Sequence, residues 1–309
     1  MNPLYNLDTN YDANRRKFIN TGLLVMGAVA VSTVPGAAVA QNLFYQKPKL
    51  TVQDVIDLIL KEINLAPIPD TIDEIKFGDA SQLVTGIVSS MFPTVAVIEE
   101  AIHLKANLII VHEPTFYTGV DRTEKLETNA IVEKKKSLLK KNNIVIWRFH
   151  DYSHAVKPDM ISHGVLQKMN WLSYENEKDP MIHIPATSLE QLIIQFKKNL
   201  GITHVRVMGN VTRSCSSIAL LPGAWGVQRH IEVVEKNKPD LLVIGELVEW
   251  ETAEYFRDAH AMGDQTALLI LGHAVSEEPG MEYFVEWLIP KLPGITIKHV
   301  ATGDPFTWK

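Results

Sequence analysis

From Thr51 onward the chain alternates between two hydrophobic patterns, one with helical spacing and one of short, continuous apolar runs. The segment from Val52 to Ile63 has apolar residues on one helical face, and Thr51 is a residue type that favours the start of a helix. The run from Leu108 to Val111 is short and rich in β-branched residues, which is typical of a strand buried on both faces. This alternation predicts βα units, and therefore an α/β fold with mainly parallel sheets.

The same patterns predict the order of elements in two α/β halves. In the first half we expect helices over 52–63, 94–104, 125–141 and 161–169, and strands over 83–88, 108–111 and 144–147. Residues 173–180 are polar, acidic and turn-rich, so they mark the boundary between a half over 41–175 and a half over 176–309. In the second half we expect helices over 188–200, 229–236, 252–262 and 280–292, and strands over 204–208, 218–221, 241–244, 267–271 and 295–299.

The first 40 residues differ in kind from the rest. A basic cluster that contains Arg15 and Arg16 precedes a weakly apolar stretch over 21–34, and residues 38–40 have the small-x-small pattern of a signal peptidase site. This order predicts a twin-arginine signal over 1–40 and a periplasmic protein. The apolar stretch falls short of the ~20 residues that cross a bilayer, so no stable membrane span is expected after processing. The twin-arginine route carries folded proteins, which fits a metal that is acquired before export.

Composition and missing motifs exclude several classes of protein. Hydrophobic residues make up 46% of the 309 residues, which is enough for a large buried core. The net charge is only −6, so no basic field attracts nucleic acid. Cys215 is the single cysteine, which leaves neither an intramolecular disulfide nor a cysteine-type zinc motif. The sequence also lacks the glycine loops of nucleotide-binding proteins and the G-x-S-x-G turn of serine hydrolases.

Residues that bind metals or transfer protons follow four of the predicted strands. In open α/β sheets, ligand sites lie at the carboxyl ends of strands, because loops from adjacent strands converge there. The residues that follow these strands are His112-Glu113-Pro114, His150-Asp151 with His154, Gly245-Glu246, and Gly272-His273 with Glu277. Imidazole nitrogens and carboxylate oxygens brought together in this way predict a divalent metal site. We interpret five further histidines as surface or helix positions without such a role: His103, His183, His204, His230 and His260.

Several of these segments, in the same order, resemble one known family. They are the segment 84–87 with the helix over 94–101, the run 106–111 with His112-Glu113-Pro114, the His150-x-x-x-His154 loop, and Gly272-His273-x-x-x-Glu277 with Gly280-Met281. Together they resemble the Nif-three-like family, whose members are also known as type 2 homologues of GTP cyclohydrolase I. The resemblance covers nearly the whole mature chain. It implies two α/β halves with a metal cleft between them, two bound metal ions, and a homo-oligomer, with a ring-like hexamer among the expected assemblies.

The resemblance also implies a set of metal ligands, carried over position by position: His112, Glu113, His154, His273 and Glu277. The chain departs from the family pattern twice. Glu113 stands where the family usually has the second histidine of His-His-Pro, and His154 stands where it usually has an aspartate. The two changes offset each other, so three histidines and two carboxylates remain. Such a mixed set suits two divalent ions of zinc, iron or manganese.

We therefore expect a metal-dependent, dinuclear hydrolase of a small-molecule substrate. Two metal ions ~3.5–4 Å apart polarise a substrate oxygen and lower the pKa of a water toward neutrality, so no activated side-chain nucleophile is needed. His150 and Glu246 follow strands without an assigned ligand role, and they are candidates for proton transfer or for orienting the ligands. The alternative is a metal-dependent binding or scaffold protein without turnover. GTP itself is a poor candidate substrate, because an exported protein meets little of it.

Overall fold

The computed structural model describes residues 49–121, 126, 128–176 and 179–309. These residues belong to one unit, Lys47–Lys309. The predicted signal over 1–40 lies outside the described residues. Within the described part of the chain, no helix is both long enough and apolar enough to cross a membrane.

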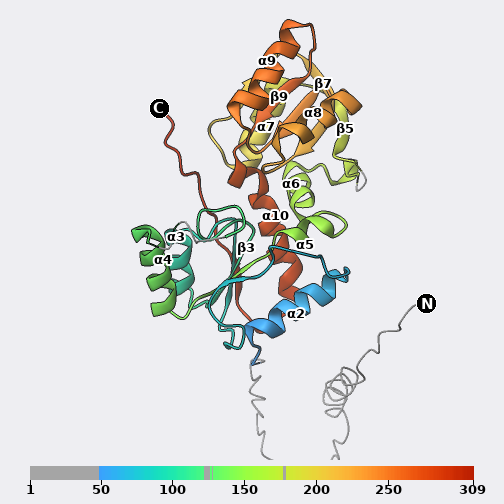
Figure 1. Ribbon diagram of the computed structural model, residues 1–309. Helices are drawn as coiled ribbons and strands as arrows, with labels where there is room; N and C mark the ends of the chain where they lie inside the picture. The colour runs from blue at the N-terminus through green and yellow to red at the C-terminus, as the bar shows by residue number, and fades with distance from the viewer. Residues whose placement is uncertain (1–48, 122–125, 127, 177–178) are drawn as a thin grey trace, which may run out of the picture. The chain divides into compact units, whose positions relative to one another are not determined.

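The first half of this unit is a five-stranded sheet with helices on both faces (Figure 1). Helices α3 and α4 pack on one face of the sheet, and α2 packs on the other face. Three of the four strand pairs are parallel, and only the β1–β4 pair is antiparallel. Across the sheet the strands are β1 (Ile75–Phe77), β4 (Val145–Arg148), β3 (Leu108–Val111), β2 (Ile87–Ser90) and β10 (Ile297–His299). The helices are α2 (Val52–Ile63), α3 (Val95–His103) and α4 (Ala130–Lys141).

The second half is another five-stranded sheet, again with helices on both faces. Its two central pairs are parallel and its two outer pairs are antiparallel, so the prediction of mainly parallel strands holds less well here. Across this second sheet the strands are β5 (Met181–Ser188), β7 (Ser214–Leu221), β8 (Leu241–Ile244), β9 (Ala267–Ile270) and β6 (Arg206–Met208). Helix α7 (Leu189–Leu200) packs on one face of this sheet. Helices α8 (Gly226–Asn237) and α9 (Glu254–Ala261) pack on the other face, and the π-helix η2 (Glu249–Ala253) leads directly into α9.

Helix α10 (His273–Leu288) connects the two sheets. It begins directly after β9 of the second sheet, packs along α6 (Met160–Met169), and leads through the 3-10 turn η3 (Ile289–Lys291) to β10 of the first sheet. The backbones of α6 and α10 touch where they cross, because a Cβ atom on Gly164 would lie 2.6 Å from the Cα atom of Gly280. The last strand of the chain therefore belongs to the first sheet, although the sequence grouped it with the second half.

Most predicted elements are present, and the exceptions have local physical causes. Strands β1 and β5 and the short helices α5 (Asp151–Ala155) and η1 (Leu172–Tyr174) were not predicted. The predicted strand over 83–88 lies instead at Ile87–Ser90. Strand β7 begins at Ser214, four residues before the predicted 218, because its first residues pair with the unpredicted strand β5. Helix α10 begins at His273, seven residues before the predicted 280. The prediction started the helix after Pro279, and proline usually breaks a helix, but α10 packs along α6 and continues through Pro279.

Candidate metal centre

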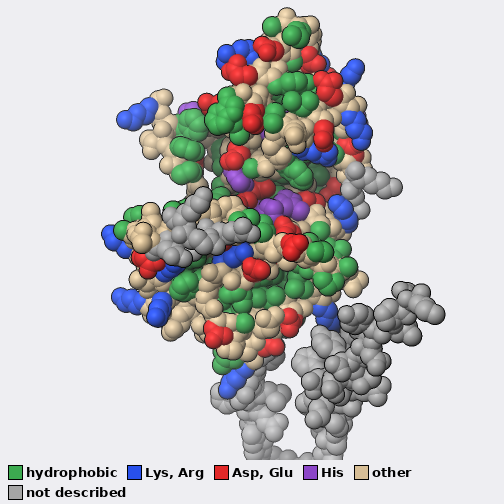
Figure 2. Space-filling model, in the orientation of Figure 1, with side chains coloured by type: hydrophobic (Ala, Val, Ile, Leu, Met, Phe, Trp, Pro, Cys, Tyr) green, Lys and Arg blue, Asp and Glu red, His purple; other side chains and the backbone are tan. Residues whose placement is uncertain are grey.

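The candidate site lies where strand ends from both sheets meet. His112 and Glu113 follow β3, and His150 follows β4 in the first sheet. From the second sheet, Glu246 follows β8, and α10 begins after β9 with its first residue at position 273. Figure 2 shows histidine side chains gathered beside acidic ones in a hollow of the molecular surface. The carboxyl ends of parallel strands thus supply the site, as the sequence predicted.

Each of four histidines at the site has its Nδ1 atom beside an oxygen atom of the protein. The pairs are His112 with the carbonyl of Phe149 at 3.3 Å, His150 with Asp151 at 3.0 Å, His154 with Asp159 at 2.8 Å, and His273 with Glu246 at 3.2 Å. An oxygen acceptor at Nδ1 holds the proton there and leaves Nε2 as the free donor atom. Oriented imidazoles of this kind are the usual arrangement of metal-ligating histidines.

The Nε2 atoms of three of these histidines, His112, His150 and His273, face the buried carboxylates of Glu113 and Glu277. The Nε2 atom of His273 lies 3.1 Å from Oε2 of Glu277 and 3.2 Å from Oε1 of Glu113. The Nε2 atom of His112 lies 3.7 Å from the same Oε2 of Glu277. Possible ligand atoms of His112, Glu113 and Glu277 lie within 4.8 Å of one another, and so do those of His112, His150 and His154. The donors therefore surround one small volume.

Two of these atoms are buried and have no hydrogen-bond partner among the described residues: Nε2 of His112 and Oε2 of Glu277. An unpaired buried polar atom costs about 1–3 kcal/mol, so native structures rarely keep one without a reason. A divalent cation bound between them would satisfy both atoms. The residues present therefore fit a metal ion.

The charges of the cluster are strongly coupled. Burial disfavours a charged His273, but the carboxylates of Glu113, Glu246 and Glu277 beside its ring outweigh burial and raise the pKa of His273 to about 12. Burial and the neighbouring imidazoles of His112 and His154 lower the pKa of His150 to about 4. Burial opposes ionisation of Glu277, but His112 and His273 hold its pKa well below the usual range. The protein by itself thus holds the imidazole of His273 in its charged form between three carboxylates.

A glycine makes room for one of these carboxylates. Gly223, in the loop after β7, has φ +80°, and a Cβ atom there would overlap Oε1 of Glu277 and lie 2.6 Å from its Cδ. The backbone N–H of Gly223 also donates to Oγ of Ser276 at 2.9 Å. The backbone at Gly223 thus approaches a candidate ligand closely.

Two aromatic side chains border the cluster. The indole ring of Trp225 lies 6.0 Å from the ring of His154, and its N–H donates to the carbonyl of Pro222. Trp225 remains 45% exposed although it adjoins a buried site. The ring of Phe92 lies 5.9 Å from that of His273. These rings give the site an apolar rim.

Comparison with known proteins decides the family. Residues 52–304 match the family model described as Duf34/NIF3 (NGG1p interacting factor 3). The chain belongs to the Duf34/NIF3 family. This confirms the resemblance seen in the sequence.

Members of the Duf34/NIF3 family with related sequences and folds are found in several bacteria. The chain is 23% identical over 242 residues to a "GTP cyclohydrolase 1 type 2 homolog" of Clostridium perfringens, covering 74% of this chain and 88% of that protein. A protein of the same name from Clostridium acetobutylicum is 24% identical over 216 residues, covering 66% of this chain and 76% of that protein. The crystal structure of a Bacillus cereus protein related to NIF3 has a TM-score of 0.68 at 15% identity, covering 85% of this chain and 100% of that one. The two-sheet fold is thus a Duf34/NIF3 fold.

All seven residues that the sequence singled out lie in this one cluster of the Duf34/NIF3 fold: His112, Glu113, His150, His154, Glu246, His273 and Glu277. Glu246 lies beside Nδ1 of His273, which is an orienting position. Sequence reasoning missed two supporting residues, Asp159 and Arg148. Asp159 contacts His154, five residues earlier, and Arg148 contacts Glu113, 35 residues earlier, and neither spacing marks such a contact. His230 lies on helix α8, outside the cluster, and is buried; its Nδ1 lies 3.0 Å from the hydroxyl of Thr252, and burial lowers its pKa to about 4.

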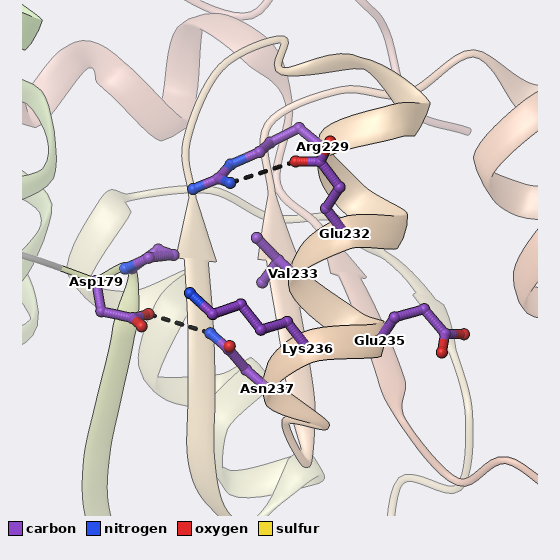
Figure 3. Close-up of a pocket in the computed structure, with 8 residues that line it drawn as sticks. Asp179, Arg229, Glu232, Val233, Glu235, Lys236 and Asn237 are labelled. Atoms are coloured by element: carbon purple, nitrogen blue, oxygen red, sulfur yellow. Dashed lines mark hydrogen bonds and ion pairs between the residues drawn. The ribbon is translucent and has the colours of Figure 1, made fainter.

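A separate pocket of about 530 Å³ lies along α8, away from this cluster (Figure 3). Its charged and polar side chains are partly paired with each other: Arg229 lies 3.5 Å from Glu232, and Asn237 donates to Asp179 at 3.1 Å. None of the seven predicted site residues lines it. The histidine cluster, with its converging donor atoms, is therefore the candidate metal centre of this Duf34/NIF3 protein.

Proposed function

We propose that this protein is a metal-dependent hydrolase of a small-molecule substrate, with two divalent ions of zinc, iron or manganese at the histidine cluster. The observation that carries the proposal is the shared orientation of four imidazoles. Each has an oxygen at Nδ1, and the Nε2 atoms of His112, His150 and His273 lie toward the buried carboxylates of Glu113 and Glu277. Four imidazoles and two carboxylates exceed the four ligands of one tetrahedral ion, so the set suits two ions with open positions.

The residues divide into ligands and supports under this proposal. His112, His154, His273, Glu113 and Glu277 remain the ligands expected from the sequence. We add His150 to them, because its Nδ1 faces Asp151 and its possible ligand atom lies within 4.8 Å of those of His112 and His154. Burial lowers its pKa to about 4, which makes it a weak base at neutral pH. Glu246 holds the proton at Nδ1 of His273. The bound ions supply polarisation of a substrate oxygen and a water nucleophile at neutral pH.

The test is a metal count followed by an activity survey. Purified protein, loaded with zinc, iron or manganese, is analysed by plasma mass spectrometry and assayed against phosphoesters, amides, cyclic amidines and GTP. We expect about two ions per chain, as for a dinuclear site, and turnover on one panel that stops when the metal is removed. Bound metal without turnover on any panel would favour the alternative, a binding or scaffold protein. Absence of bound metal would refute the centre itself.

Metal affinity is expected to rise with pH. His273 is protonated in the metal-free protein because its pKa is about 12, and a cation must displace that proton from Nε2. Raising the pH lowers the competition from protons, so affinity should increase about tenfold per pH unit for each proton displaced. Zinc titrations between pH 6 and 8, with an indicator dye in weak buffer, should record release of at least one proton per chain. The His273→Ala variant should release one proton fewer, and a flat affinity in the wild-type protein would contradict this charge assignment.

We also propose that residues 1–40 direct export by the twin-arginine route to the periplasm, and that the protein is a homo-oligomer. The basic pair Arg15 and Arg16, the weakly apolar stretch and the small residues before position 41 support the first proposal. Replacing both arginines with lysine should move the protein from the periplasmic to the cytoplasmic fraction of expressing cells. An unchanged distribution would argue against this route. Light scattering of the purified protein tests the assembly.

A further inference from the structure

A buried arginine lies beneath the candidate metal centre. Arg148 is the last residue of β4 and pairs in register with Val111, the last residue of β3. Its side chain is 2% exposed. Because a buried guanidinium is costly unless its charge and donors are matched, its partners show what the fold uses it for.

The guanidinium contacts the loop that carries the first two candidate ligands. Its Nε donates to the carbonyl of His112 at 3.0 Å, and Nη1 donates to the carbonyl of Gly119 at 2.6 Å. Its Nη2 donates to Oε2 of Glu113 at 3.2 Å. A second carboxylate, that of Asp121, lies 3.6 Å from Nη1. Arg148 therefore holds both the backbone of this loop and one carboxylate oxygen of Glu113.

The two oxygens of Glu113 thus face opposite ways. Oε2 is bound to Arg148, whereas Oε1 lies 3.2 Å from Nε2 of His273 and 3.9 Å from Nε2 of His150. We propose that Arg148 is a positioning residue of the metal centre, which presents Glu113 to the cation through Oε1 alone. This inference rests on the proposed metal centre and assigns a residue that the ligand set does not contain.

Two physical effects follow from this geometry. With one oxygen engaged by Arg148, Glu113 cannot close on a cation with both oxygens, which leaves a coordination position open. The guanidinium also offsets the charge that Glu113 adds to a site already containing Glu277 and Glu246. If Arg148 acted only as a clamp on the loop, its replacement would weaken zinc binding by the same factor with or without the Glu113 carboxylate.

The two roles are separated by a double-mutant cycle on zinc affinity. The variants are Arg148→Lys, Glu113→Ala and the double substitution, and the affinity of each purified protein for zinc is measured by competition with a chromophoric chelator. Lysine keeps the charge but lacks the fork that reaches the His112 carbonyl, the Gly119 carbonyl and Glu113 together. We expect Arg148→Lys alone to weaken zinc binding about 10- to 100-fold, the usual effect of removing a group that orients a ligand. In the Glu113→Ala background the same change should weaken binding less than about threefold, because no carboxylate remains to be positioned.

Asp121→Asn is the matched control. It alters the other carboxylate beside Arg148 but leaves Glu113 intact, so it should lower the melting temperature of the metal-free protein and change zinc affinity less than about threefold. Equal losses of zinc affinity for Arg148→Lys in both backgrounds, or an equal loss in Asp121→Asn, would overturn the proposal. Should Arg148→Lys fail to fold, Arg148→Gln is put through the same cycle and the same criterion applies. A wild-type protein that binds no zinc would instead refute the metal centre.

Discussion

Replacement of His112 by alanine is expected to abolish tight metal binding. His112 is fully buried, its Nδ1 faces the carbonyl of Phe149, and its Nε2 lies 3.7 Å from Oε2 of Glu277. Its possible ligand atom belongs to both groups of converging donors, so its loss affects every arrangement of ions in the cluster. The loss of zinc affinity should exceed the ~100-fold that follows from removing an orienting partner. Mass spectrometry of the metal content and chelator competition measure it.

The stability of the same variant gives an independent reading. Wild-type protein with zinc at a thousand times its dissociation constant should gain about 4 kcal/mol in free energy of unfolding, whereas His112→Ala should gain almost none. Without metal the two proteins should differ little, because the substitution also removes an unpaired buried nitrogen that itself costs about 1–3 kcal/mol. His183→Ala, which changes an exposed histidine on β5, is the control and should keep the full zinc response. Undiminished zinc binding by His112→Ala would remove His112 from the ligand set.

Replacement of Gly164 by alanine is expected to destabilise the fold and to weaken the metal centre at a distance. A Cβ atom at this position would overlap the carbonyl oxygen of Pro279 and lie 2.6 Å from the Cα atom of Gly280. These are backbone atoms of α10, so the helices must move apart. The cost should reach about 3 kcal/mol, the upper end of the range for overpacking, because no side chain can yield. Thermal unfolding should then occur roughly 6–12 °C lower.

The effect on metal binding follows from what the two helices carry. Helix α6 begins directly after Asp159, which holds His154, whereas α10 carries His273 and Glu277 in its first two turns. Separation of α6 from α10 therefore separates ligands, and zinc affinity of the folded protein should fall as well. Gly201→Ala is the control, since Gly201 has φ +68° with no atom near its Cβ position and should cost only about 1–2 kcal/mol. Equal melting temperatures for the two variants would show that the α6–α10 contact is not tight.

Much of the site was predictable because the residues concerned follow apolar runs that are easy to recognise. Strands β3 and β8 were predicted with the observed bounds, and the residues after them, His112 and Glu246, lie in the observed cluster. Burial on both faces makes such strands continuous in hydrophobicity, and parallel pairing brings their carboxyl ends to one edge. Strands β1 and β5 were not predicted: the three residues of β1 are only partly buried, and the eight residues of β5 mix buried and exposed positions, so their hydrophobic patterns are weak.

The sequence by itself determined the class of fold, the family and the identity of the seven residues that gather at one site. It did so because hydrophobic periodicity and residue type are local properties of the chain. The tertiary structure alone decided that β10 returns to the first sheet and that Arg148 holds Glu113. It also decided that Gly223 makes room for Glu277, 54 residues further along. Contacts of this kind depend on how closely helices and sheets pack against one another. The spacing of residues along the sequence does not show which distant residues that packing brings together.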